Sequence, residues 1–288
     1  MEVVFLGTGA AEGVPAAYCR CAACQGVRKR GGVEVKTRSS IRIGPHHQID
    51  IGPDHYGQVS RAGLDMFDVE HVLVTHSHED HFDFFGLAAK SMARETNGKP
   101  IDVYASEPAK AYLLRVVDTL KPSSEDLAWV SKNVALHGLS YFGDYDVGGL
   151  AVKTVKANHT AHGQGEYAIN YLVELPNRRS LLYACDTGYY TDDTWRYLEG
   201  KHVDTLIMEC TFAGRTDRPE LPSGHLDLPS FFKMLERMTA IGVADSRTSV
   251  YATHFNPHQG LTHHEIQKRF DDSRFRVVAG YDGLRLEA

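Results

Sequence analysis

The amino-acid sequence predicts an α/β or α+β fold, and three observations carry this prediction. Short apolar, β-branched segments alternate along the chain with segments whose apolar residues recur at helical spacing. The β-rich segments gather in two long stretches, each with flanking helices. The 288 residues are 42% hydrophobic, which is enough for a large core, and no Pro/Gly/Ser-rich linker or charge block divides them. We therefore expect a single domain over residues 1–288.

In the first half of the chain, apolar and β-branched runs predict strands over residues 2–6, 40–43, 48–51, 70–75 and 101–104. Gly44 and Pro45 mark the turn of a hairpin between the second and third of these strands. Apolar residues at helical spacing predict helices over residues 82–94 and 108–119. A β-rich stretch over residues 130–155 closes this half.

The second half opens with an expected hairpin, and Asn177 lies near its turn. The expected strands of this half cover residues 168–174, 180–184, 203–208, 248–252, 275–279 and 284–286. The expected helices cover residues 192–198, 228–238 and 262–270. The order of these elements leaves α/β and α+β architectures both open.

Residues 75–81 read T-H-S-H-E-D-H and place four candidate metal ligands within six positions: His76, His78, Asp80 and His81. Imidazole and carboxylate are the ligands that a borderline divalent ion such as zinc or manganese prefers. So short a loop cannot easily give all four groups to one metal, but it can serve two adjacent metals. The motif follows a predicted buried strand, where α/β folds place their sites. The alternative is a histidine-rich surface loop.

Three more candidate ligands each follow an apolar strand: His159, Asp186 and His254. Taken singly, each would more often be a capping or surface residue. In this order after H-x-H-x-D-H, they resemble the pattern of the metallo-β-lactamase superfamily of binuclear metal hydrolases. The resemblance implies a four-layer αββα sandwich with two divalent metal ions, zinc or manganese, in its active site.

The same resemblance implies how the ligands are shared. The first metal is held by His76, His78 and His159. The second metal is held by Asp80, His81 and His254, and Asp186 bridges both. Asp50, in the run I-D-I-G, matches an acidic residue that ends an early strand in this superfamily. Its implied role is to orient a ligand histidine through the nitrogen that does not bind metal, and the alternative is a turn residue.

Cysteines near the N-terminus suggest a further metal. Cys19, Cys21 and Cys24 form a C-x-C-x-x-C cluster, and three thiolates so close together in a reducing compartment indicate structural zinc. The alternative is a set of free thiols, which would invite oxidation. Cys185 and Cys210 lie in apolar segments and are expected to be buried packing residues.

The run G-T-G-A-A-E-G-V-P over residues 7–15, followed by the cysteine cluster, resembles the PhnP-type phosphoribosyl cyclic phosphate phosphodiesterases. The similarity spans nearly the whole chain and implies an N-terminal zinc-binding loop over about residues 7–30. In that family a histidine shortly after the last catalytic-site histidine completes the structural zinc site. His258 is the match here, although its spacing from His254 is one residue longer than the family pattern.

Catalytic groups beyond the metals follow from the resemblance as well. His225, in S-G-H-L-D-L, matches a histidine that phosphodiesterase branches place over the phosphoryl group, where it would stabilise charge or donate a proton to the leaving group. Glu209 resembles its acidic partner in tRNase Z relatives and would raise its pKa. Asp80 is counted with them as a catalytic group. The alternatives are a helix N-cap neighbour for His225 and a strand-end salt bridge for Glu209.

The resemblance implies a metal-dependent phosphodiesterase that opens a small cyclic phosphodiester, such as 5-phosphoribosyl 1,2-cyclic phosphate, in phosphonate metabolism. A tRNase Z-like nuclease is an alternative, but the net charge of −6 argues against a broad nucleic-acid surface. A lactonase or thioesterase would be expected to carry Tyr or Asp in the acid position where this chain has His225. A PqqB-like non-catalytic protein shares the cysteine cluster, but this chain retains every ligand of the H-x-H-x-D-H motif.

The expected partner is a small phosphodiester rather than nucleic acid or a membrane, and a homodimer is left open. The first residues carry no basic signal-peptide region, and no apolar run approaches the roughly 18 residues of a membrane span, so we expect a cytoplasmic protein. A second phosphate on the substrate would need a basic partner. The sequence offers Lys36, Arg38 and Arg42 without favouring one of them.

Overall fold

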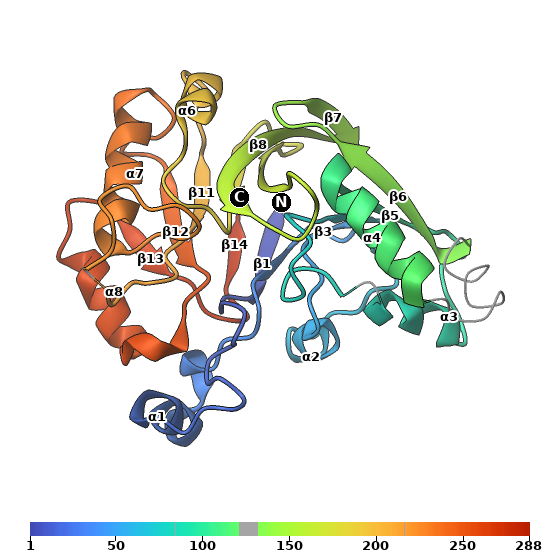
Figure 1. The fold of residues 1–288 in the computed structure, drawn as a ribbon, viewed down its shortest axis with the longest axis horizontal. Helices are drawn as coiled ribbons and strands as arrows, with labels where there is room; N and C mark the ends of the chain where they lie inside the picture. Colours follow the sequence, from blue (N-terminus) through green and yellow to red (C-terminus); the bar gives the residue numbers. More distant parts are fainter. Residues whose placement is uncertain (84, 121–131, 216) are drawn as a thin grey trace.

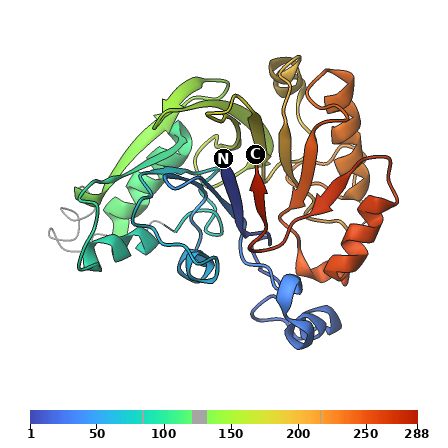
Figure 2. The same ribbon diagram turned by 180° about the vertical axis from the view of Figure 1, so that it is seen from behind.

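The structure, a computed structural model, describes residues 1–83, 85–120, 132–215 and 217–288. It contains two mixed sheets of seven strands each, which face each other (Figures 1 and 2). The first sheet has the strand order β14-β1-β2-β3-β4-β5-β6. Its strands are β1 (Glu2–Gly7), β2 (Ser40–Ile43), β3 (His47–Ile49), β4 (His71–Leu73), β5 (Ile101–Ser106), β6 (Val134–Leu139) and β14 (Arg285–Glu287).

The second sheet has the order β13-β12-β11-β10-β9-β8-β7. Its strands are β7 (Asp144–Val147), β8 (Leu150–Thr160), β9 (Tyr167–Glu174), β10 (Ser180–Ala184), β11 (Thr205–Glu209), β12 (Ser249–Thr253) and β13 (Val277–Ala279). In each sheet the strands from one edge to the centre are antiparallel and the remaining strands, β3 to β6 or β10 to β13, are parallel. The carboxyl ends of parallel strands meet at one edge of a sheet, which brings together the loops that follow them.

Helices cover the outer face of each sheet, which completes four layers and confirms the predicted fold class (Figure 1). The first sheet is flanked by α2 (His55–Arg61), α3 (Ala89–Met92) and α4 (Glu107–Leu120). The second sheet is flanked by α6 (Asp192–Leu198), α7 (Leu228–Ala240) and α8 (His263–Asp271). The apolar core between the sheets includes the fully buried side chains of Phe5, Ile41, Tyr171 and Tyr183.

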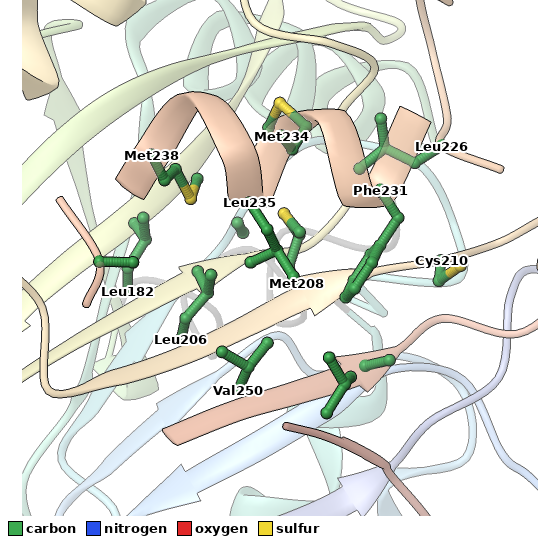
Figure 3. Close-up of a cluster of buried hydrophobic side chains, with 14 of the residues drawn as sticks. Leu182, Leu206, Met208, Cys210, Leu226, Phe231, Met234, Leu235, Met238 and Val250 are labelled. Carbon is green, nitrogen blue, oxygen red and sulfur yellow. The ribbon is translucent and has the colours of Figure 1, made fainter. Parts of the chain in front are cut away.

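Helix α7 shows how the outer layers are held. Its buried residues Phe231, Met234, Leu235 and Met238 recur at helical spacing and pack on strands of the second sheet (Figure 3). Burial of each such side chain contributes about 1.5–3 kcal/mol. A capping box between Asp227 and Ser230 fixes where the helix begins. The preceding turn, which carries the candidate residue His225, is therefore anchored to the core.

The predicted strands and helices appear in the predicted order, with three differences. The helix expected over residues 82–94 is broken into a 3-10 turn, η2 (Phe85–Ala88), and the short α3, and residue 84 of that prediction lies outside the described residues. The main chain of Asp83 instead donates to the carbonyl of Ile51, 2.6 Å away, which draws this segment toward the sheet. The first residues of the β-rich stretch expected over 130–155, residues 130 and 131, also lie outside the described part.

The second difference is the length of β8, which continues through Thr160. His159 therefore lies inside a strand rather than after it, in the irregular segment between Lys156 and Thr160 where the pairing register with β9 shifts. The third difference is that the sequence reasoning missed α1 (Ala22–Arg30), α2 and the short 3-10 turns η1 (Gly32–Glu34) and η3 (Pro257–Gln259). Helix α1 buries only Cys24 and Val27, so its apolar periodicity is too weak to detect.

Candidate metal centre

Strained main-chain positions mark the ends of three strands. Asp50, Asp186 and His254 follow β3, β10 and β12, and their φ angles are 60°, 47° and 60°. A positive φ is uncommon outside glycine, costs about 1–3 kcal/mol and concentrates at functional sites. All three side chains belong to one buried cluster of histidines and carboxylates.

One part of this cluster is a group of three histidines, His76, His78 and His159, whose ring nitrogens lie within 4.8 Å of one another. The Nδ1 atom of His78 is 2.9 Å from Nε2 of His76 and 3.3 Å from Nε2 of His159. Burial lowers the pKa of all three rings, and that of His78 to about 4. The three imidazoles are therefore neutral at physiological pH, which is the form that binds metal.

The second part of the cluster consists of Asp80, His81 and His254. The Nε2 atom of His81 lies 3.1 Å from Oδ2 of Asp80, and Nε2 of His254 lies 3.7 Å from the same oxygen. Both Nε2 atoms are buried and have no hydrogen-bond partner in the described part of the chain. Burial opposes charge on His81, but the carboxylates around it, with Asp186 first, raise its pKa well above the usual range. This part of the cluster carries excess negative charge that a cation would neutralise.

Asp186 stands between the two groups. Its Oδ1 lies 3.2 Å from Nε2 of His81 and 3.0 Å from Nε2 of His254. Its Oδ2 lies 3.7 Å from Nε2 of His76 and 3.8 Å from Nε2 of His159. One carboxylate thus turns one oxygen toward each group, as a bridging ligand must. The imidazole and carboxylate donors and the unpaired buried nitrogens fit two adjacent divalent cations of the zinc or manganese type.

Asp50 lies where the sequence placed it relative to a ligand histidine. Its fully buried carboxylate is 2.7 Å from Nδ1 of His81 and also accepts hydrogen bonds from the main chain and hydroxyl of Thr75. Such a contact fixes the ring and leaves its other nitrogen for a metal. Gly52 is required beside it, because a Cβ atom there would lie 2.1 Å from the carbonyl oxygen of Asp80.

Two other candidate ligand histidines, His254 and His159, have similar partners, which the sequence reasoning did not identify. The Thr211 hydroxyl is 2.8 Å from Nδ1 of His254, and the carbonyl oxygen of Gly224 is 2.9 Å from Nδ1 of His159. These partners come from loops that lack sequence periodicity, so only the fold reveals them. Each contact orients a ring toward the interior of the cluster.

Two further buried residues hold this region in place. Cys185 packs in the interior as expected, but its thiol also donates to Oδ1 of Asp186 over 3.2 Å. Glu166, which is 1% exposed, accepts hydrogen bonds from the main chain of Ser77 at 2.8 Å and of Gly163 at 2.6 Å, and from the Ser77 hydroxyl at 2.6 Å. Since Ser77 lies inside the histidine motif, Glu166 fixes the conformation of that loop.

His225 and Glu209 form a pair at the edge of the cluster. Nδ1 of His225 is 2.9 Å from Oε1 of Glu209, whose side chain is fully buried, while the His225 side chain is 25% exposed. The His225 ring stacks on that of His254 with centroids 5.3 Å apart, and it lies 4.8 Å from the ring of His159. Burial opposes charge on His225, but the Glu209 carboxylate outweighs it and raises the pKa. A protonatable imidazole therefore lies directly against the two metal-ligand groups.

The cysteine cluster also comes together. The sulfur atoms of Cys19, Cys21 and Cys24 lie within 4.8 Å of one another, and His258 lies close enough to Cys21 to contribute to the lowering of its pKa. Hydrogen bonding, chiefly from the main chain of Cys24, lowers the pKa of Cys21 to about 6. Burial raises the pKa of Cys24 to about 11. The three sulfurs fit the thiolate part of a tetrahedral zinc site, and His258, on η3 in contact with α1, is the candidate for the fourth ligand.

The basic residues proposed to grip a second phosphate are already engaged. Lys36 and Arg42 are each 4% exposed, and both donate to main-chain carbonyl groups. Arg38 forms an ion pair with Asp54 at 3.0 Å. Lys36 and Arg42 are therefore buried and engaged by the main chain, and the charge of Arg38 is compensated by Asp54. Within the residues that the structure describes, no helix combines the length and the hydropathy that a membrane crossing requires.

Comparisons with known proteins agree with this geometry. A family model described as the beta-lactamase superfamily domain matches residues 48–267. A diphosphatase from the PhnP family is 21% identical, with a TM-score of 0.73 over 100% of this chain and 97% of the other. Zinc-bound PqqB from Methylobacterium extorquens is 20% identical, with a TM-score of 0.70 over 100% of both chains. The short form of human tRNase Z is 17% identical, with a TM-score of 0.63 over 100% of this chain and 99% of the other.

At these identities the solved structures show a shared fold and no more. A search of curated proteins finds no match. The family model, in contrast, covers most of the chain, including the histidine motif and the strand ends that complete the cluster. The chain therefore belongs to the beta-lactamase superfamily and is a metal-dependent hydrolase of the metallo-β-lactamase fold.

Proposed function

We propose that the chain is a binuclear metal-dependent phosphodiesterase that hydrolyses a small cyclic phosphodiester, such as 5-phosphoribosyl 1,2-cyclic phosphate. The observation that carries this proposal is the buried Glu209, which holds the protonatable His225 against the metal-ligand cluster. The N-terminal motif and the fold likeness to a diphosphatase from the PhnP family support hydrolysis at phosphorus. The acidic net charge of −6 favours a small substrate over a nucleic acid.

The proposed ligands fall into three sets. One cation is held by His76, His78 and His159. The other is held by Asp80, His81 and His254, with Asp186 shared between them. When bound, two divalent cations supply positive charge for the phosphate oxygens and lower the pKa of a water molecule. A third ion, structural zinc, is held by Cys19, Cys21, Cys24 and His258.

The protein's own contribution is made on the leaving-group side. Hydrolysis breaks a phosphorus–oxygen bond, and the departing oxygen needs a proton. The hydrogen bond from Nδ1 of His225 to Glu209 stabilises the protonated ring and leaves Nε2 to donate. Glu209 also accepts main-chain hydrogen bonds from Thr187 at 2.8 Å and from Leu226 at 3.2 Å, which keep it ionised and immobile. The pair therefore acts as a fixed general acid.

The test combines metal analysis with a substrate panel. Elemental analysis of the purified chain should find about three metal ions per chain, two in the cluster and one in the cysteine site. Bis(p-nitrophenyl) phosphate, cyclic ribose phosphates, a nucleoside diphosphate, RNA, lactones and thioesters are then assayed with zinc or manganese. We expect turnover of the small diesters above all others. Preferential turnover of RNA, a lactone or a thioester would reject the proposal, and no turnover at full metal content would indicate a non-catalytic protein.

His225→Ala tests the assigned acid. We expect this variant to keep its metal content and to lose about 10²–10⁴-fold in diesterase activity. His137→Ala is the control, because His137 also pairs with a carboxylate, that of Asp102 at 2.7 Å, but on strands β6 and β5 of the first sheet and with a more exposed side chain. Normal turnover by His225→Ala would remove this histidine from the mechanism.

A further inference from the structure

A second cationic group lies beside the proposed general acid. Nη2 of Arg218 donates to the main-chain carbonyl of His225 at 3.1 Å. The guanidinium carbon also lies 4.2 Å from the ring centre of Phe212, and that ring is 6.0 Å from the imidazole of His225. Stacking on Phe212 and the hydrogen bond to His225 together fix the guanidinium relative to the site where the phosphodiester would be cleaved.

Arg218 has no carboxylate within ion-pair distance among the described residues; the adjacent Asp217, which pairs with Arg215, interacts with it only at longer range. Its buried Nε has no hydrogen-bond partner among the described residues. Its Nη1 also has no partner among them and is not among the buried atoms, so solvent reaches it. Buried or fixed donors are normally satisfied by protein, water or ligand, which makes this group an open binding position.

Arg215 on the same loop provides the contrast. It lies over the same Phe212 ring at 5.8 Å, but its guanidinium is bound by Asp217 through contacts of 2.9 and 2.8 Å. Its charge is therefore compensated and its donors are used. Of the two arginines around Phe212, Arg218 is the one that contacts His225, and among the described residues it forms no ion pair.

We propose that Arg218 binds a second anionic group of the substrate, a phosphate monoester carried on the leaving-group side of the diester. This inference rests on the proposed function and assigns a binding residue to the further phosphate that a substrate such as 5-phosphoribosyl 1,2-cyclic phosphate carries. A guanidinium is always charged, and its planar set of donors matches phosphate oxygens better than a lysine does. In a chain with a net charge of −6, local positive charge at the site is what attracts an anionic substrate.

A pair of matched substrates separates this role from a structural one. Ribose 1,2-cyclic phosphate is compared with its 5-phosphorylated form in the wild type and in Arg218→Ala, Arg218→Lys and Arg215→Ala. We expect Arg218→Ala to raise KM for the phosphorylated substrate about 10–100-fold while leaving kcat and the unphosphorylated substrate nearly unchanged. Arg218→Lys should lie between the wild type and Arg218→Ala, and Arg215→Ala should resemble the wild type.

An equal loss on both substrates would show that Arg218 only supports the loop, and the proposal would be overturned. Calorimetry with ribose 5-phosphate and ribose on the metal-loaded protein provides a readout that needs no turnover. Loss of ribose 5-phosphate binding in Arg218→Ala, but not in Arg215→Ala, supports the anion site even if no diester is hydrolysed. If diesters are hydrolysed and Arg218→Ala binds ribose 5-phosphate normally, the anion site fails while the diesterase function stands. Equally tight binding of the corresponding 5-carboxylate would overturn the assignment to phosphate.

Discussion

The two sheets contribute to the metal cluster in different ways. The first sheet supplies its ligands from one loop after β4, where His76, His78, Asp80 and His81 lie within six positions. The second sheet supplies single residues from three separate strand ends, at positions 159, 186 and 254. A contiguous motif can be recognised in a sequence, whereas dispersed ligands are brought together only by the fold. Asp186 joins the two contributions, because each of its oxygens faces one group.

The largest effect is expected where the two contributions meet. Asp186→Ala removes the carboxylate shared by both proposed cation sites, so we expect loss of metal from the cluster. The rate should fall by more than about 10⁴-fold, beyond the loss of a single general acid. Elemental analysis and diesterase assays at fixed metal concentration measure both quantities. If this variant still held two ions in the cluster, the two proposed cation sites would not depend on a shared carboxylate.

Glu209→Gln tests the proposed general acid, His225, which lies in a loop of the second sheet next to Glu209. The carboxylate raises the pKa of His225, so its removal should lower that pKa. A general acid must be protonated to act, and the high-pH limb of the kcat profile should therefore move to lower pH. We expect activity to fall about 10–100-fold at neutral pH, as for other lost orienting partners. If the pH profile of kcat did not shift, Glu209 would not control the pKa of the catalytic acid.

A matched pair of variants compares the residues that orient one ligand histidine from the first sheet, His81, and one from the second, His254. Asp50→Asn weakens the contact to His81, and Thr211→Val removes the contact to His254. Each should weaken metal binding about 10–100-fold. Asp50→Asn should have the larger effect, because Asp50 is charged and fully buried. Metal titration against a chelator of known affinity gives the two values, and a larger effect of Thr211→Val would reverse this ranking.

The smallest effect on catalysis is expected at the cysteine site, which lies apart from the histidine and carboxylate cluster. Cys21→Ser should remove one ion per chain and lower the melting temperature without emptying the metal cluster. Each kcal/mol lost lowers Tm by about 2–4 °C in a domain of comparable size, so a drop of several degrees is expected. Residual diesterase activity below the new Tm should stay near that of the wild type. If Cys21→Ser lost all of its ions, metal binding in the cluster would depend on the cysteine site, contrary to this prediction.

The sequence was most informative where local patterns and the fold agree. The strands and the candidate ligands of the histidine motif could be predicted, because apolar periodicity and ligand spacing are local signals, whereas the αββα arrangement was implied by the resemblance to the metallo-β-lactamase superfamily. The break in the helix expected over residues 82–94 could not, because it depends on a main-chain hydrogen bond to Ile51 from a distant strand. The extension of β8 through His159 depends likewise on pairing with β9.

The residues that sequence reasoning missed act through tertiary contacts. Glu166 meets Ser77 across 89 positions, and Thr211 meets His254 across 43. Arg218 stands out only because its guanidinium stacks on Phe212 and forms no ion pair within the described part of the chain. No local pattern distinguishes these residues from other glutamates, threonines or arginines. In contrast, Lys36 and Arg42 were candidates for phosphate binding in the sequence, but in the structure they donate hydrogen bonds to main-chain carbonyl groups.

The central claim is that Asp186 bridges two cations, each also held by imidazoles from the histidine motif and from separate strand ends. Anomalous X-ray diffraction from crystals of the zinc-loaded chain, collected on both sides of the zinc absorption edge, tests it most directly. We predict two peaks about 3.5–4 Å apart on opposite sides of the Asp186 carboxylate. A third peak is expected among Cys19, Cys21, Cys24 and His258. A single peak at Asp186, or peaks only away from it, would contradict the account.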